Sequence, residues 1–95
     1  MADRVIVVHK VAQYERWKAR FDAAAGLRTA GGELSFEVLR AVDDGDLVVH
    51  TATWSSHEAA RAFFESSEVE AVRREAGVEA PTFLYLAVAD AGPVP

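Results

Sequence analysis

Two histidines on neighbouring predicted strands are the side chains of this sequence best suited to chemistry. His9 follows the apolar run of residues 5–8, and His50 lies inside a second apolar run over residues 47–54. Because imidazole titrates near neutral pH, two such rings facing one pocket would suit proton transfer by general acid or base catalysis. A structural alternative stays open for each, in which the ring is partly buried and satisfied by backbone groups. His57 falls in the first turn of a predicted helix among polar neighbours, which indicates a surface position.

Aromatic side chains recur on the predicted helices and on the later strands. Those predicted to line a pocket for a flat aromatic or polyketide-like molecule are Tyr14, Trp17, Trp54, Phe63, Phe64 and Tyr85. Aromatic stripes at helical spacing also build ordinary hydrophobic cores, so the same residues fit a protein without a ligand. A buried Tyr or Trp needs a hydrogen-bond partner, however, and a ligand can supply one.

The sequence predicts neither a metal site nor a bound cofactor. No two histidines share a helix turn, and the acidic group Asp43, Asp44 and Asp46 is typical of a hydrophilic turn. The chain has no cysteine, which excludes disulfides, thiolate metal sites and thiol nucleophiles. Phosphate-binding loops, dinucleotide fingerprints and Gly-x-Ser-x-Gly elbows are also absent from it.

The elements that must position these residues follow from hydrophobic periodicity, which predicts the order β-α-β-β-α-β. Predicted strands cover residues 4–11, 34–42, 47–54 and 83–88, and a first helix covers residues 13–30. The first strand is apolar on both faces, so it is expected at the centre of the sheet.

Turn and cap signals separate these elements. Gly31-Gly32 ends the first helix, and the segment 43–46 predicts an Asp-Gly hairpin that pairs the second and third strands antiparallel. Two capping-box spacings, Ser55 with Glu58 and Ser67 with Glu70, predict that the second helical region breaks in two.

Right-handed crossovers between these elements give a ferredoxin-like α+β fold, a four-stranded antiparallel sheet with both helical segments on one face. The opposite face then has nothing in this chain to cover it. Because three of the strands carry apolar residues on both faces, the uncovered face would exceed the apolar patch that monomers usually tolerate. The sequence therefore predicts a homodimer that packs sheet to sheet.

Length and charge bound the possibilities further. The 95 residues, 51% of them hydrophobic, suffice for one domain over 1–95, with an ordered core at about 4–89 and a mobile tail at 90–95. A net charge of −5, with only 10 Lys and Arg and no basic stripe, argues against nucleic acid as a partner. No signal peptide is recognisable, and no apolar run approaches the ~20 residues of a membrane span. A cytoplasmic protein that meets no membrane is expected.

Three segments carry a family resemblance: residues 8–17 (VHKVAQYERW), residues 54–66 (WSSHEAARAFFES) and residues 83–86 (FLYL). They resemble the dimeric α+β barrel superfamily, and within it small proteins related to antibiotic biosynthesis monooxygenases. The resemblance implies a dimer whose two sheets form a central barrel, with an apolar pocket in each subunit between sheet and helices. Such proteins include cofactor-free oxygenases of aromatic polyketides, haem-degrading enzymes, muconolactone isomerases, polyketide cyclases and proteins of no known activity.

The sequence departs from that family pattern at two points. Many of the monooxygenases and haem-degrading enzymes carry a histidine nine or ten residues past the tryptophan of the third strand, where this chain has Phe63 and Phe64. An asparagine is expected near the first strand, and this chain contains none. The departures argue against haem and against the usual oxygenase constellation.

Two functional hypotheses remain. The first, which we favour, is a small cofactor-independent enzyme of monooxygenase, isomerase or cyclase type. Its substrate is a hydrophobic aromatic or polyketide-like molecule, His9 or His50 moves a proton, and the aromatic residues hold the substrate. The alternative is a non-catalytic dimeric small-molecule-binding or accessory protein with structural histidines.

Overall fold

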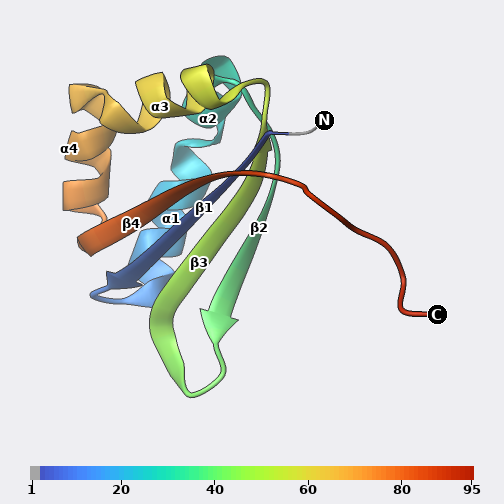
Figure 1. Ribbon diagram of the computed structural model, residues 1–95. Coiled ribbons are helices and arrows are strands. Elements are labelled where there is room, and N and C mark those ends of the chain that lie inside the picture. The colour runs from blue at the N-terminus through green and yellow to red at the C-terminus, as the bar shows by residue number, and fades with distance from the viewer. Residues whose placement is uncertain (1–2) are drawn as a thin grey trace.

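The computed structural model, which describes residues 3–95, confirms the ferredoxin-like fold (Figure 1). All four strands pair antiparallel, in the order β2-β3-β1-β4. The elements are β1 (Asp3–Val11), α1 (Tyr14–Ala23), α2 (Ala25–Gly31), β2 (Glu33–Ala41), β3 (Asp44–Trp54), α3 (His57–Glu65), α4 (Ser67–Glu75) and β4 (Val78–Ala87).

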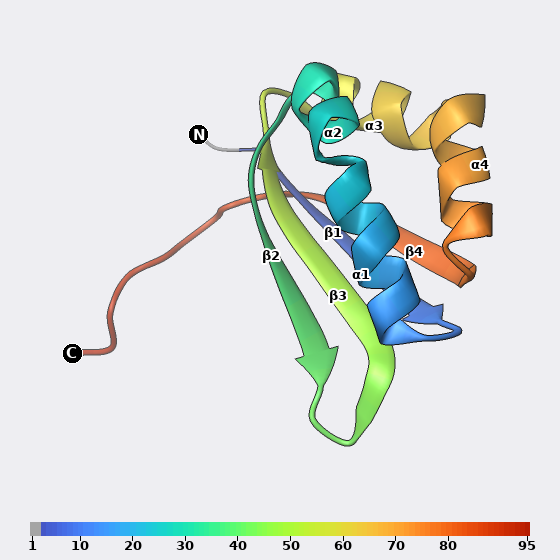
Figure 2. The ribbon, with the colours of Figure 1, turned by 180° about the vertical axis from the view of Figure 1, so that it is seen from behind.

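The helices form one layer over a single face of the sheet (Figures 1 and 2). β1 lies between β3 and β4, so the prediction of a central first strand is correct. Its residues Val5, Val7 and Val11 point into the core, as do Val48 and Trp54 of β3. Alternate residues of both strands therefore carry the hydrophobic contact with the helices.

The first helical region is two helices, whereas the sequence predicted one. Ala24 interrupts it with φ −90° and ψ 8°, and its N–H lies within 3.1 Å of the Arg20 oxygen and 3.2 Å of the Phe21 oxygen. The Phe21 carbonyl also accepts a hydrogen bond from the Arg28 guanidinium, a buried contact made possible by the break. Hydrophobic periodicity cannot predict such a contact, because it indicates only which residues face inward.

Both serine caps lie one residue away from their predicted positions. Ser56 caps α3 by accepting the Ala59 N–H at 3.0 Å, and Ser66 caps α4 by accepting the Val69 N–H at 3.2 Å. Ser55 instead contacts the turn between α2 and β2, since its N–H donates to the Gly32 oxygen at 2.8 Å. The predicted break of the second helical region into two is confirmed.

Two strand boundaries also differ from the prediction. The hairpin turns at Val42 and Asp43 rather than at Asp-Gly, and β4 starts at Val78 and runs through Pro81. Proline is tolerated there because β4 is an edge strand. The register with β1 shifts between Val8 and Lys10, and this bulge lies beside His9.

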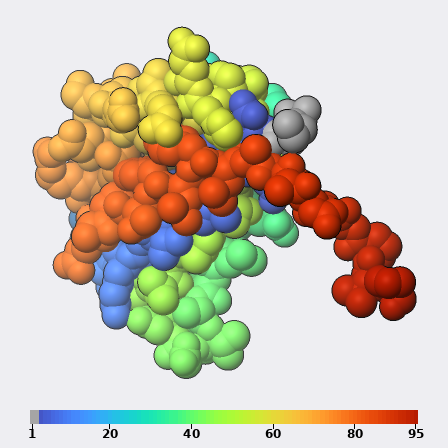
Figure 3. All heavy atoms as spheres, in the orientation of Figure 1, coloured from blue at the N-terminus to red at the C-terminus, as the bar shows by residue number. Residues whose placement is uncertain are grey.

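The other face of the sheet is uncovered by the described residues. Its large exposed side chains are Leu39, Leu47, Leu84 and Leu86. The chain after β4 runs away from the sheet and its residues are exposed (Figure 3). No helix among residues 3–95 has the length and apolar character to span a membrane.

Candidate functional site

A cavity of about 70 Å³ lies between the helices and the sheet. Val7 and His9 of β1 and His50 of β3 form its floor, and side chains of all four helices form its walls. The helix pairs α1–α2 and α3–α4 pack on each other chiefly through α2 and α3. The cavity lies where the two pairs diverge, and its lining is mainly apolar.

Both predicted catalytic histidines line this cavity, and Trp17, Phe63 and Phe64 line it with them. His9 and His50 are 5% and 4% exposed, so the walls shield both rings from water. His9 packs against Trp17 at 5.3 Å between ring centroids. The structure thus brings together five residues from the predicted site, although their roles remain predictions.

The other predicted binding residues lie outside the cavity wall. Tyr14 stacks under the Arg40 guanidinium at 3.7 Å, and Tyr85 lies 3.9 Å from that of Arg61. Trp54 packs behind the wall on Phe63 and Phe64, with centroids 5.2 and 5.4 Å away, and its buried indole N–H meets no acceptor within residues 3–95. A role for these three in binding stays a prediction.

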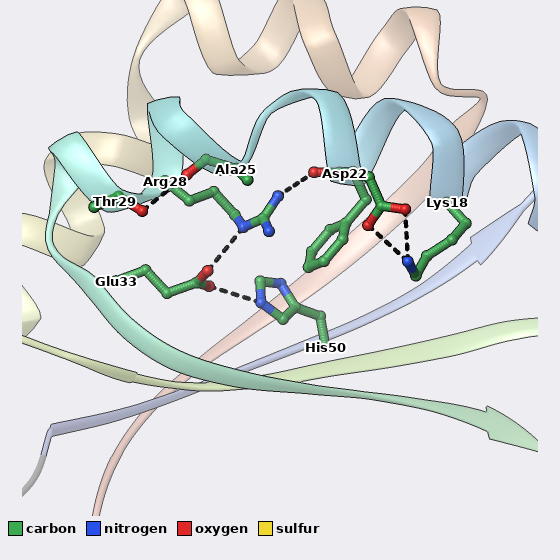
Figure 4. A network of polar contacts seen from close by, with 8 residues as sticks. Lys18, Asp22, Ala25, Arg28, Thr29, Glu33 and His50 are labelled. Atoms are coloured by element: carbon green, nitrogen blue, oxygen red, sulfur yellow. Dashed lines mark hydrogen bonds and ion pairs between the residues drawn. The ribbon is translucent and has the colours of Figure 1, made fainter.

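His50 belongs to a buried polar network that the sequence did not reveal (Figure 4). The Glu33 carboxylate lies between two partners: its Oε2 is 2.8 Å from His50 Nε2, and its Oε1 accepts from Arg28 Nε at 2.8 Å. All three side chains are 7% exposed or less. The Arg28 guanidinium also stacks on the Phe21 ring at 3.6 Å.

The charge of Glu33 fixes the tautomer of His50. Burial raises the pKa of Glu33, but hydrogen bonds from His50 and Arg28 outweigh it and lower the pKa below its ordinary value. Glu33 is therefore ionised at neutral pH and can only accept hydrogen bonds, so His50 Nε2 must carry the hydrogen. In the neutral ring Nδ1 is then the free base, and the carboxylate stabilises the imidazolium formed when that base takes a proton.

His9 is in the opposite situation, because its buried ring packs on the Trp17 indole and no carboxylate of the described residues lies with it on the cavity wall. Neither Nδ1 nor Nε2 has a partner among the described residues. Burial, together with repulsion from His50 when that ring carries an added proton and from Arg73, lowers the pKa of His9 to about 4. The ring is neutral at pH 7 and offers the cavity one N–H donor and one nitrogen acceptor.

Arginines from three helices border the cavity: Arg20 of α1, Arg28 of α2 and Arg73 of α4. Arg28 is neutralised by Glu33, whereas Arg20 is exposed. Arg73 is half-buried, and its Nη1 donates to the Phe64 oxygen at 3.0 Å. The polar groups at the cavity are thus imidazole and guanidinium, and no described residue places a carboxylate on its wall.

Sequence reasoning missed Arg28, Glu33 and Arg73. Arg28 and Glu33 flank the Gly31-Gly32 turn, and charged residues beside a turn usually indicate a solvent-exposed surface. One signal for Glu33 was available in the sequence. This residue stands at the start of a strand, on the same face of the sheet as the candidate His50 of the neighbouring strand. Arg73 carries no such signal, because Arg74 beside it is chemically identical.

Within residues 3–95 there is no group of three or more His, Asp or Glu side chains arranged to hold a metal ion. The imidazole and guanidinium groups of the wall suit proton transfer and hydrogen bonding. The fold is ferredoxin-like α+β, and a buried Glu–His pair and an imidazole without a hydrogen-bond partner among residues 3–95 lie at one apolar cavity between its sheet and its helices.

A family model described as antibiotic biosynthesis monooxygenase matches residues 7–75. The chain belongs to this family, as the sequence resemblance implied. A comparison with curated proteins gives no match.

Solved structures share the fold over nearly the whole chain. SnoaB, a cofactor-independent oxygenase from Streptomyces nogalater, matches with a TM-score of 0.80 and 14% identity, covering 98% of each chain. The monooxygenase of ActVA-Orf6 from Streptomyces coelicolor, in complex with the ligand nanaomycin D, has a TM-score of 0.66 and 22% identity. That match covers 99% of this chain and 93% of the other. Rv0793 from Mycobacterium tuberculosis matches with a TM-score of 0.66 and 17% identity, covering 96% of this chain and 99% of the other. At these identities the likeness establishes the fold.

Proposed function

We propose that this chain is a cofactor-independent enzyme of monooxygenase type that acts on a hydrophobic aromatic or polyketide-like molecule. The observation that carries the proposal is a pair of histidines on the wall of one apolar cavity. One is oriented by a buried carboxylate, and the other has no hydrogen-bond partner among residues 3–95. SnoaB is itself described as a cofactor-independent oxygenase, and its fold is shared.

In this proposal the two rings have different tasks. His50 Nδ1 takes a proton from an acidic C–H or phenolic O–H of the substrate, and Glu33 stabilises the resulting imidazolium. The neutral His9 donates its single N–H to an oxygen of the bound substrate, in a site that excludes water. Trp17, Phe63 and Phe64 hold the rings of the substrate.

Dioxygen can accept the electrons of the deprotonated substrate without a bound cofactor. An aromatic methylene and one dioxygen then give a carbonyl and one water, which balances atoms and electrons. An isomerase or a cyclase would use the same first proton transfer and differ in the later steps. Two such subunits, packed through their uncovered sheet faces, form the functional homodimer in this proposal.

Oxygen uptake with anthrone, whose oxidation product is anthraquinone, tests the oxygenase. We expect His50→Gln to lower kcat by about 10²-fold or more while the protein stays folded, because glutamine can donate to Glu33 but cannot accept the proton. Unchanged turnover in this variant would refute the role of His50. Product analysis under nitrogen separates an isomerase or cyclase from an oxygenase, since only the oxygenase stops.

The cavity volume favours the accessory protein as a second candidate. About 70 Å³ is far below the roughly 300 Å³ of the smallest drug-sized pockets, so an aromatic tricycle requires the helix pairs to separate. Binding of aromatic compounds without turnover of any, and equal binding by the His50→Gln variant, would support this candidate.

A further inference from the structure

Arg73 is a partly buried cation that pairs with no carboxylate of the described chain. Among residues 3–95, no ion pair includes it, and the nearby Glu70 carboxylate is bonded to Arg74 at 2.8 Å. Its hydrogen bond to the Phe64 oxygen, made by Nη1, leaves most of the guanidinium donors free within the same residues. The guanidinium also lies over the Phe83 ring, 5.1 Å from its centroid, so this half-buried cation has an aromatic neighbour but no counter-ion in direct contact among the described residues.

His9 faces the same cavity and also lacks a polar partner among the described residues. The ring is 5% exposed, both nitrogens lack partners in the part of the chain that the structure describes, and the charge of Arg73 lies close enough to lower its pKa. A buried imidazole without hydrogen bonds costs stability. One molecule that accepts hydrogen bonds and carries negative charge would satisfy both residues at once.

We propose that the cavity selects aromatic carboxylic acids, with the carboxylate bound between His9 on β1 and Arg73 on α4 and the ring lying on Trp17, Phe63 and Phe64. One carboxylate oxygen accepts the His9 N–H and the other accepts from the Arg73 guanidinium. Arg28 takes no part, because Glu33 already neutralises it. Arg20 adds a second positive charge at the rim.

This inference rests on the proposed function in one respect: it names the class of substrate for the same cavity. It concerns equilibrium binding, so it stands or falls without any turnover. A protein that binds acids but catalyses nothing would refute the enzyme and leave this inference intact. An enzyme that turns over neutral compounds and does not bind acids would support the proposed function and refute this inference.

Benzoate and benzamide form a matched pair of probes, equal in shape and different in charge. We expect benzoate to bind about tenfold or more tightly than benzamide by calorimetry, since charge-assisted hydrogen bonds are the stronger ones. Tryptophan fluorescence gives a second readout, because Trp17, one of the two tryptophans, lies on the wall. Equal binding of the two compounds, or no binding of benzoate at millimolar concentration, would overturn the proposal.

Neighbouring arginines provide the control. Arg73→Gln should abolish the preference for benzoate, and Arg74→Gln should keep it, because Arg74 is exposed and paired with Glu70 on the surface. A preference that survives Arg73→Gln, or is lost in both variants alike, contradicts the assignment.

Titration of the unmodified protein gives a test that needs no variant. The groups that act on His9 are His50 from β3 and Arg73 from α4, with Arg20 and Arg28 also on the cavity wall. A bound carboxylate adds a negative charge beside the ring and should raise the His9 pKa, as followed by NMR of the imidazole. Benzamide should leave that pKa unchanged, and a benzoate complex with unchanged His9 would place the acid elsewhere.

Discussion

At the scale of single residues, His9 combines nearly complete burial with two nitrogens that find no partner in residues 3–95, and such a group is retained at a cost in stability. Replacing it by phenylalanine removes the unsatisfied polar atoms and keeps a flat ring against Trp17. We expect His9→Phe to raise the free energy of unfolding by about 1 kcal/mol, measured by urea denaturation. A loss of several kcal/mol would show that His9 is structural.

The pH dependence of stability follows from the same ring. The pKa of His9 is about 4 in the folded protein against an ordinary 6.5, so the unfolded chain binds more protons between these values. Stability is therefore full above about pH 6.5 and falls on acidification, by about 2 kcal/mol at pH 5 from this group alone. The difference between the unmodified protein and His9→Phe isolates this contribution from carboxylates such as Glu33. A difference that stays constant from pH 7 to 5 would contradict the shifted pKa.

Glu33 is the residue on which the buried network depends. Glu33→Gln removes the negative charge that pairs with buried Arg28, and an uncompensated charge of this kind costs about 3 kcal/mol. Glu65→Gln on α3 is the control, because Glu65 is exposed on the helix layer and away from the proposed dimer face, and it should change stability by less than about 0.5 kcal/mol. Thermal or urea unfolding of the two variants side by side measures the difference. Equal stability of both would mean that the network is not coupled to the fold.

At the scale of elements, the turn between α2 and β2 places Glu33 under His50. Gly32 has φ 116°, and an added Cβ would lie 2.5 Å from the Ser55 hydroxyl. Gly32→Ala should therefore lower the free energy of unfolding by about 1–3 kcal/mol through both backbone strain and the clash. It should also disturb the approach of Glu33 to His50.

Gly26→Ala provides the matched control for that substitution. Gly26 lies within α2, and no described atom stands within 4 Å of an added Cβ. This variant should stabilise the protein by about 0.5–1 kcal/mol, because alanine favours helix more than glycine does. If both glycine variants changed stability alike in denaturation experiments, the left-handed turn would have no special role.

At the scale of the whole molecule, the sheet face that the described residues leave uncovered is the basis of the proposed homodimer. Leu84 and Leu86 of β4 are 42% and 39% exposed, and they lie beside Ile6 and Arg4 of β1 on that face. An apolar surface of this kind is typical of an interface between copies of a chain. The homodimer is a proposal that sedimentation can test directly.

Leu84→Glu should convert that dimer to a monomer, because each subunit would then bury a carboxylate on the apolar face that forms the interface. Val42→Glu at the tip of the hairpin, where the side chain is fully exposed, should leave the dimer intact. Analytical ultracentrifugation at micromolar concentration distinguishes the two. A monomeric mass for the unmodified protein would rule out the sheet-to-sheet dimer.

The family of the chain was predictable from its sequence, and so was the grouping of five candidate residues at one cavity. His9 and His50 share a face because their strands are neighbours and each residue occupies an inward position. The break at Ala24 was not predictable, since neither proline nor a loss of periodicity marks it. The positions of Tyr14, Trp54 and Tyr85 behind the cavity wall depend on packing that periodicity does not describe.

The sequence by itself determined the order of the elements, their apolar faces and hence the ferredoxin-like sheet, because alternation and helical spacing are local properties of the chain. Only the tertiary structure decided which polar groups meet. The contact of Glu33 with His50 spans 17 positions, and it requires both the Gly32 turn and the pairing of β2 with β3. Likewise, the apolar surroundings of His9 are a property of everything packed against it. The histidines therefore differ because of their surroundings, which no segment of the sequence contains alone.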